Sequence, residues 1–66
     1  MDVIINGERR TVEPDTTVAD VVRSLTTATS GVAVARNDEV VPKADWNHTA
    51  VTDNDRIDVL TAVQGG

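Results

Sequence analysis

The sequence predicts an α+β domain in which one helix packs on one face of a mixed sheet of four to five strands. Three observations indicate this class. Valine and isoleucine alternate with polar residues in several short segments, as in half-buried strands. Only residues 17–25 place apolar side chains at helical spacing. Turn-forming dipeptides separate the segments, and a chain of 66 residues has room for one small domain.

The N-terminal residues 1–13 are predicted to form a β-hairpin. Val3 and Ile5 share one face of the first strand, and the dipeptide Asn6-Gly7 suits the positive φ angles of a type I′ turn. The return strand is rich in charge, which is typical of a sheet edge, where charge discourages pairing with other molecules. We therefore expect this strand at the edge of the sheet.

One amphipathic helix follows the hairpin. Thr17 is its predicted N-cap, and Asp20, three residues further on, completes the pattern of a capping box. The apolar stripe of this helix consists of Val18, Val21, Val22 and Leu25. Because valine has a low helix propensity, we expect packing against the sheet to hold this helix in place.

The second half of the chain predicts three further strands. Residues 32–41 alternate around Asn37-Asp38 as strand, turn and strand. Residues 43–51 are predicted as a loop with a short helical turn, in which Trp46 covers the open end of the core. The last strand begins near Arg56, after a turn rich in Asn and Asp.

The predicted order is β-β-α-β-β-β, and the first and last strands are the most apolar. These two strands are expected side by side in the centre, which is the β-grasp arrangement of ubiquitin-like domains. Ile4, Leu60 and Ala62 have the parity of the face that the helix leaves open. They are candidates for a partner-docking patch, although an ordinary scatter of surface aliphatic residues fits the same pattern equally well.

The composition argues against several classes of function. The chain has no cysteine and one histidine, so thiolate zinc sites, iron–sulfur clusters and disulfides are excluded, and we expect no metal site. A net charge of −5 with scattered arginines makes nucleic-acid binding improbable. No signal-peptide pattern or membrane-length apolar run is present, so we expect a cytoplasmic protein that does not bind membranes and is a monomer when free.

The chain ends in Gly65-Gly66, directly behind the last predicted strand. At an average glycine usage of about 7%, this ending arises by chance in roughly one chain in 200. Two residues without a Cβ atom can enter a narrow channel with a free choice of φ. We therefore expect a β-grasp domain over residues 1–63 and a flexible tail over residues 64–66, and this tail is the candidate site.

Five segments carry a resemblance to a known family. They are the "NG" after the first strand, "TVADVV", "VAVARNDEVVPKADW", "DNDR" and "VLTAVQGG". Over the whole chain they resemble the ThiS family, the sulfur carriers of thiamine thiazole biosynthesis, which are related to the small subunit of molybdopterin synthase and to ubiquitin-like modifiers. The Val-Pro step followed by Trp in "VVPKADW" favours the thiazole branch. The "DND" of the last turn is a departure, because relatives often have glycine there.

The resemblance implies a function for each residue of the tail and for Val63, which precedes it. Gly66 would carry the sulfur, Gly65 would provide clearance, and Gln64 and Val63 would set where the tail leaves the sheet. A ThiF-type enzyme, holding the ATP and Mg²⁺, would adenylate the Gly66 carboxylate. A persulfide donor would then convert it to a thiocarboxylate for a ThiG-type thiazole synthase. The chain would be a carrier and not an enzyme, with no bound cofactor of its own.

Three alternatives remain open from the sequence. A partner of molybdopterin synthase would share the fold and the chemistry and differ only in the acceptor enzyme. A ubiquitin-like modifier would join Gly66 to lysines of other proteins, although Lys43 is the only lysine through which such a modifier could form chains. A plain interaction domain would have a Gly-Gly end that is merely flexible.

Overall fold

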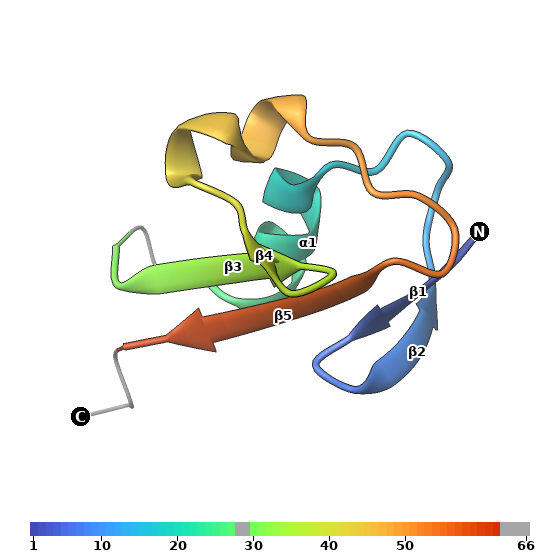
Figure 1. The fold of residues 1–66 in the computed structure, drawn as a ribbon, viewed down its shortest axis with the longest axis horizontal. Helices are drawn as coiled ribbons and strands as arrows, with labels where there is room; N and C mark the ends of the chain where they lie inside the picture. Colours follow the sequence, from blue (N-terminus) through green and yellow to red (C-terminus); the bar gives the residue numbers. More distant parts are fainter. Residues whose placement is uncertain (28–29, 63–66) are drawn as a thin grey trace.

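A computed structural model describes residues 1–27 and 30–62 of the chain (Figure 1). Its strands are β1 (Asp2–Ile5), β2 (Glu8–Thr11), β3 (Val32–Arg36), β4 (Glu39–Val40) and β5 (Arg56–Thr61). They form one five-stranded sheet in the order β2-β1-β5-β3-β4. The central pair, β1 and β5, is parallel, and the other neighbours are antiparallel. The predicted mixed sheet, with the first and last strands in its centre, is confirmed.

Two tight turns set the register of the hairpins. Asn6 and Gly7 have φ angles of 50° and 82°, and Asn37 and Asp38 have φ angles of 52° and 71°. These consecutive positive values are those of type I′ turns, whose twist matches that of the flanking strands. Asparagine, aspartate and glycine tolerate this conformation best, so the local sequence determines where each hairpin reverses.

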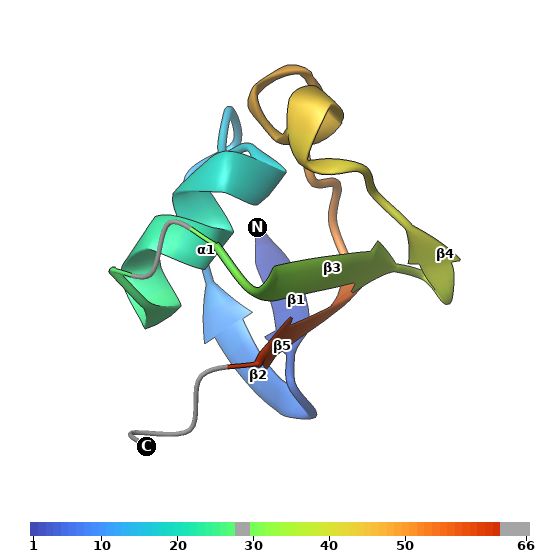
Figure 2. The ribbon, with the colours of Figure 1, turned by 90° about the vertical axis from the view of Figure 1, so that its left-hand side faces the viewer.

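The helix α1 (Val18–Leu25) begins with the predicted capping box. The Asp20 N–H donates to Thr17 Oγ1 at 3.2 Å, and the Thr17 N–H donates to Asp20 Oδ2 at 3.0 Å. Its buried residues are Val18, Ala19, Val21 and Val22, whereas Leu25 is only partly buried. The buried stripe includes Ala19 because the 3₁₀ helix η1 (Lys43–His48) packs against α1 (Figure 2).

The core lies between one face of the sheet and the layer formed by α1 and η1 (Figure 2). Its sheet residues are Val3, Ile5, Val34, Ile57 and Val59. Trp46 from η1 is 9% exposed, and its indole N–H donates to the Val41 carbonyl at 2.9 Å. Each fully buried valine or isoleucine stabilises the fold by roughly 1.5–3 kcal/mol. The predicted position of Trp46 over the core is confirmed.

Asp55 is buried just before β5, with 5% of its surface exposed. Its Oδ2 accepts hydrogen bonds from Arg36 Nε and the Thr52 N–H, both at 2.7 Å. Its Oδ1 accepts from Asn37 Nδ2 at 3.0 Å and from the Thr52 hydroxyl at 2.9 Å. Burial alone would raise the pKa of this carboxyl, but these hydrogen bonds, that of Arg36 foremost, lower it to about 2. Asp55 thus ties the β3–β4 turn to the start of β5.

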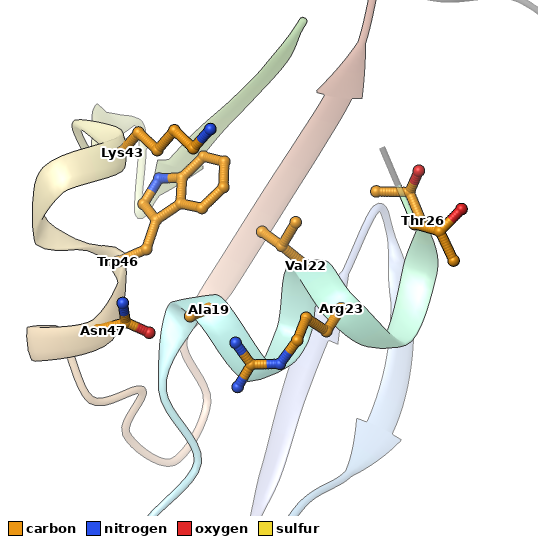
Figure 3. Close-up of a pocket in the computed structure, with 8 residues that line it drawn as sticks. Ala19, Val22, Arg23, Thr26, Lys43, Trp46 and Asn47 are labelled. Carbon is orange, nitrogen blue, oxygen red and sulfur yellow. The ribbon is translucent and has the colours of Figure 1, made fainter. Parts of the chain in front are cut away.

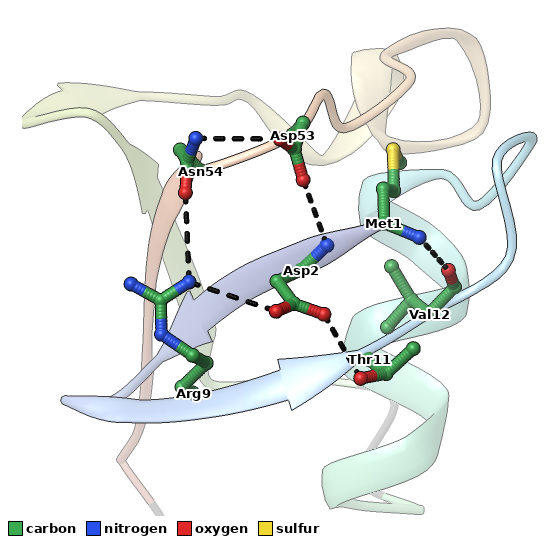
Figure 4. A network of polar contacts seen from close by, with 7 residues as sticks. All are labelled: Met1, Asp2, Arg9, Thr11, Val12, Asp53 and Asn54. Atoms are coloured by element: carbon green, nitrogen blue, oxygen red, sulfur yellow. Dashed lines mark hydrogen bonds and ion pairs between the residues drawn. The ribbon is translucent and has the colours of Figure 1, made fainter.

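A second polar network joins the last turn to the first hairpin (Figure 4). The Asp2 N–H donates to Asp53 Oδ1 at 2.8 Å, and the Thr11 hydroxyl donates to Asp2 Oδ1 at 2.9 Å. Arg9 lies 3.8 Å from the Asp2 carboxylate and donates to Asn54 Oδ1 at 3.5 Å. The φ of Asn54 is 69°, so asparagine takes the left-handed conformation that glycine would otherwise supply. Both networks secure the start of β5.

Candidate functional site

The end of β5 is held by the centre of the sheet. β5 pairs with β3 over five residue pairs, from Arg36 opposite Ile57 to Val32 opposite Thr61. One residue further, the Ala62 N–H donates to the Gly31 carbonyl at 2.5 Å. The backbone is therefore fixed by hydrogen bonds as far as Ala62.

The three residues of the predicted tail, Gln64, Gly65 and Gly66, and Val63 before them lie outside the described residues. Their predicted roles, and the domain boundary at residue 63, stay predictions. The described part of the site is thus the point from which the tail starts.

A shallow hollow of about 560 Å³ lies beside this point. It is lined by Gly31, Val32, Ala33, Leu60, Thr61 and Ala62. These side chains are small or apolar, apart from the hydroxyl of Thr61. The surface around the end of β5 is therefore suited to contact with a partner protein rather than to chemistry of its own.

An apolar strip, which we define as Ala33, Ala35, Val40 and Leu60, extends from this hollow across the open face of the sheet. Ala33 is the cross-strand neighbour of Leu60, and Ala35 is that of Val40. Val40 and Leu60 are 73% and 72% exposed, and they are the large hydrophobic residues most exposed among those described. Sequence reasoning missed Val40, although a register counted from the Asn37-Asp38 turn would have placed it opposite Ala35.

The three residues predicted as a docking patch do not all lie together. Leu60 and Ala62 line the same hollow. Ile4 lies on the same open face but beside Arg56, four residues from Leu60 along β5, which is about 13 Å at the rise of a strand. The charged side chains of Arg56 and Asp58 lie between them on this face. The docking role of these residues stays a prediction, and the strip offers Leu60 nearer apolar neighbours than Ile4.

A separate groove of about 480 Å³ lies on the helix side of the sheet, between α1 and η1 (Figure 3). Ala19 and Val22 of α1 face Trp46 of η1 across it. Arg23 at its rim is paired with Asp20 at 2.5 Å. The apolar strip and Ala62 lie on the other face of the sheet. A partner bound to that face would therefore leave this groove uncovered.

Neither a metal-binding cluster nor a membrane-spanning helix is present among the described residues, 1–27 and 30–62. They contain no group of three or more His, Cys, Asp or Glu side chains placed to hold a metal ion. None of their helices is long and apolar enough to cross a membrane.

Comparison with known proteins gives consistent matches. A family model described as "ThiS family" matches residues 3–66. The chain is 27% identical to the sulfur carrier protein ThiS of Escherichia coli K12, with both chains covered completely. It is 36% identical, over its full length, to a thiazole synthase of Paramagnetospirillum magneticum. It spans only 20% of that longer relative.

Solved structures agree with the sequence matches. The crystal structure of the thiamine biosynthesis protein ThiS from Geobacter metallireducens superimposes with a TM-score of 0.80 at 29% identity, and each chain is covered completely. A solution structure of a thiamine biosynthesis protein from the same organism gives a TM-score of 0.79 at 29% identity, with 88% of that chain covered. The predicted β-grasp fold and the predicted family are confirmed. The chain therefore belongs to the ThiS family.

Proposed function

We propose that this chain is the sulfur carrier of thiamine thiazole biosynthesis and that it carries sulfur as a thiocarboxylate on Gly66. The observation that carries the proposal is the family match, which runs through the Gly-Gly end of the chain. The sheet supports it, because β5 is a central strand and leads directly towards that end. A rigid anchor followed by residues without side chains suits a carboxylate that must enter another protein's active site.

The chemistry needs activation of a carboxylate, which is a poor acyl donor. Attack of the Gly66 carboxylate on the α-phosphate of ATP forms an acyl adenylate and releases pyrophosphate. A persulfide then displaces AMP and forms an acyl disulfide, and a thiol cleaves this disulfide to leave the thiocarboxylate. The ATP, the Mg²⁺ and the catalytic groups belong to a ThiF-type enzyme in this proposal. The chain is then a co-substrate that has no bound cofactor, and not an enzyme.

The acceptor in this proposal is a ThiG-type thiazole synthase. Support comes from the longer relative, a protein named thiazole synthase, one fifth of which aligns with the whole of this chain. A carrier-like stretch within the same polypeptide as a synthase favours the thiazole branch over molybdopterin synthase and over protein modification. We propose that the apolar strip, with Ala62, contacts the partner enzymes.

We infer the cellular location and the oligomeric state from the same chemistry. Activation consumes ATP, so we place the carrier in the cytoplasm, where ATP is supplied. We expect it to be a monomer when free, because its tail and its strip must remain available to successive partners.

An intact-mass measurement tests the proposal. The chain is incubated with a ThiF-type enzyme, ATP, Mg²⁺ and a persulfide donor, and we expect one terminal oxygen to be replaced by sulfur. A chain lacking Gly66 is the matched control and should stay unchanged. If the full chain also stays unchanged while the same enzyme converts the Escherichia coli relative, the proposal is wrong.

A further inference from the structure

The groove between α1 and η1 has an apolar floor and a basic rim. Its floor consists of Ala19 and Val22 of α1 and of the indole ring of Trp46 of η1. Arg23 lies on the α1 wall and Lys43 on the η1 wall (Figure 3). Binding sites are typically apolar hollows of this size, about 480 Å³, with a few polar groups that orient the ligand. The groove therefore has the composition of a binding site.

The charge of this rim differs from the charge of the chain as a whole. The chain has eleven acidic and six basic residues. The residues that line the groove include Arg23 and Lys43 but no Asp or Glu. The hollow between β2 and α1, in contrast, is lined by Arg10 together with Glu13 and Asp20. The groove is thus a basic site on an acidic protein, and it favours an occupant with negative charge.

Arg23 can bind a further carboxylate although Asp20 already lies beside it. Asp20 Oδ1 accepts from Arg23 at 2.5 Å, and Asp20 Oδ2 accepts from the Thr17 N–H in the capping box. A guanidinium has several N–H donors, so a contact with one carboxylate does not use all of them. Arg23 and Asp20 are 66% and 46% exposed, and such a surface pair rearranges at little cost. Neither Arg23 nor Lys43 has to be unpaired, because each also attracts an anion through its charge.

The position of the groove indicates which partner can reach it. It lies on the side of the sheet that carries α1 and η1, whereas the apolar strip lies on the opposite face (Figure 2). In the proposed function, the adenylating enzyme holds the carrier through the strip while the acyl adenylate exists. The persulfide donor has to reach that complex, because its sulfur displaces AMP there. The helix side of the carrier is then the face that remains open to the donor.

We propose that the groove between α1 and η1 binds an acidic, amphipathic segment of the persulfide donor, which is a protein in this inference. The apolar side chains of the segment pack on Ala19, Val22 and Trp46, as in other complexes where an amphipathic segment fills an apolar groove. Its carboxylates face Arg23 and Lys43. The inference rests on the proposed function and adds the place where the donor binds. The carrier then contacts two partners at once, one on each face.

Reversal of the charge at Arg23 tests the groove. Arg23→Glu places a negative charge on the rim, where it repels the acidic segment. Arg10→Glu is the matched control, because Arg10 is 49% exposed, pairs with Glu8 at 2.8 Å and does not line the groove. Both variants change the net charge equally and remove one exposed ion pair. At a low donor concentration, we expect thiocarboxylate formation to be roughly tenfold slower in Arg23→Glu than in Arg10→Glu.

Inorganic sulfide separates docking of the donor from activation of the carrier. HS⁻ attacks the acyl adenylate, displaces AMP and leaves the thiocarboxylate, with loss of one proton and without a donor protein. With sulfide, the two variants should therefore react at equal rates. Equal rates with the donor protein, or a deficit of Arg23→Glu that persists with sulfide, would overturn the groove as the site of the donor. A failure of the unmodified chain with both sulfur sources would refute the proposed function instead.

The indole N–H of Trp46 gives a second measurement that needs neither a variant nor the reaction. Trp46 is the only tryptophan, so an isotope-labelled chain gives one indole signal in an NMR spectrum. The unlabelled donor should shift this signal, because the ring lines the groove. An unshifted signal at excess donor would overturn the inference even if thiocarboxylate forms. The same signal, unchanged in free Arg23→Glu, shows that this variant keeps its fold.

Discussion

Neutralising Asp55 should strongly destabilise the fold, because this carboxylate is buried although it lies in a polar turn. Its pKa is lowered from 3.8 to about 2. At 1.36 kcal/mol per pKa unit, this corresponds to roughly 2 kcal/mol of stability that depends on the charge. In Asp55→Asn, the amide also turns an N–H₂ group towards donors, which adds roughly 1–3 kcal/mol for an unsatisfied group. We expect a total loss of about 3–5 kcal/mol.

The pH dependence of this contribution has a definite sign. The carboxyl binds its proton more weakly in the folded state than in the unfolded state, so its contribution is fully present above the unfolded pKa. It is lost as the pH falls from about 4 towards 2. In Asp55→Asn this part of the acid dependence should be absent, so the difference between the unfolding free energies of the two proteins should narrow at low pH.

Urea denaturation followed by Trp46 fluorescence provides the assay, since Trp46 is the only tryptophan and is buried. Asp58→Asn is the matched control: its carboxylate is 46% exposed and lies 3.8 Å from Arg56. Surface pairs of this kind contribute about 1 kcal/mol or less. A loss in Asp55→Asn no larger than in Asp58→Asn, or an unchanged acid dependence, would refute the reasoning.

Three further predictions concern the strip, the end of β1 and the helix cap. Leu60→Ser should weaken binding to thiazole synthase roughly tenfold with little change in the urea midpoint, because the side chain is 72% exposed; unchanged binding in a titration would remove Leu60 from the docking surface. Asn6→Gly keeps the positive φ and removes the acceptor of the Val59 N–H, so it should lower the unfolding free energy by about 1 kcal/mol; no loss would mean that water replaces this acceptor equally well. Thr17→Ala should cost about 1 kcal/mol through the capping box, measured by thermal unfolding, and a midpoint equal to that of the unmodified chain would contradict this role.

The features that sequence reasoning predicted best are those set by neighbouring residues. The turns at Asn6-Gly7 and Asn37-Asp38 follow from residues that tolerate positive φ. The capping box follows from two side chains three residues apart. Such features need no knowledge of the rest of the fold, and they place the hairpins and the helix within one or two residues.

The sequence predicted the Gly-Gly end, but it did not predict the apolar strip or the burial of Asp55. The apolar strip depends on which residues of β3, β4 and β5 lie opposite one another, and parity alone grouped Leu60 with Ile4 rather than with Val40. The burial of Asp55 was missed because its turn looks uniformly polar. Its main partner, Arg36, is 19 residues away in the chain. Contacts of this kind are set by register and topology, which no local pattern contains.

The sequence by itself thus determined the family, the order of the elements and the Gly-Gly end at which the chemistry is proposed. It did so because these depend on local conformational preference and on the absence of other reactive groups. Only the tertiary structure decided that β1 stops beside Ile57 while β5 continues to Thr61, and that Asn6 closes the ladder between them. The physical reason is that a strand edge exists only relative to its neighbours, so its pairing is a property of the assembled sheet.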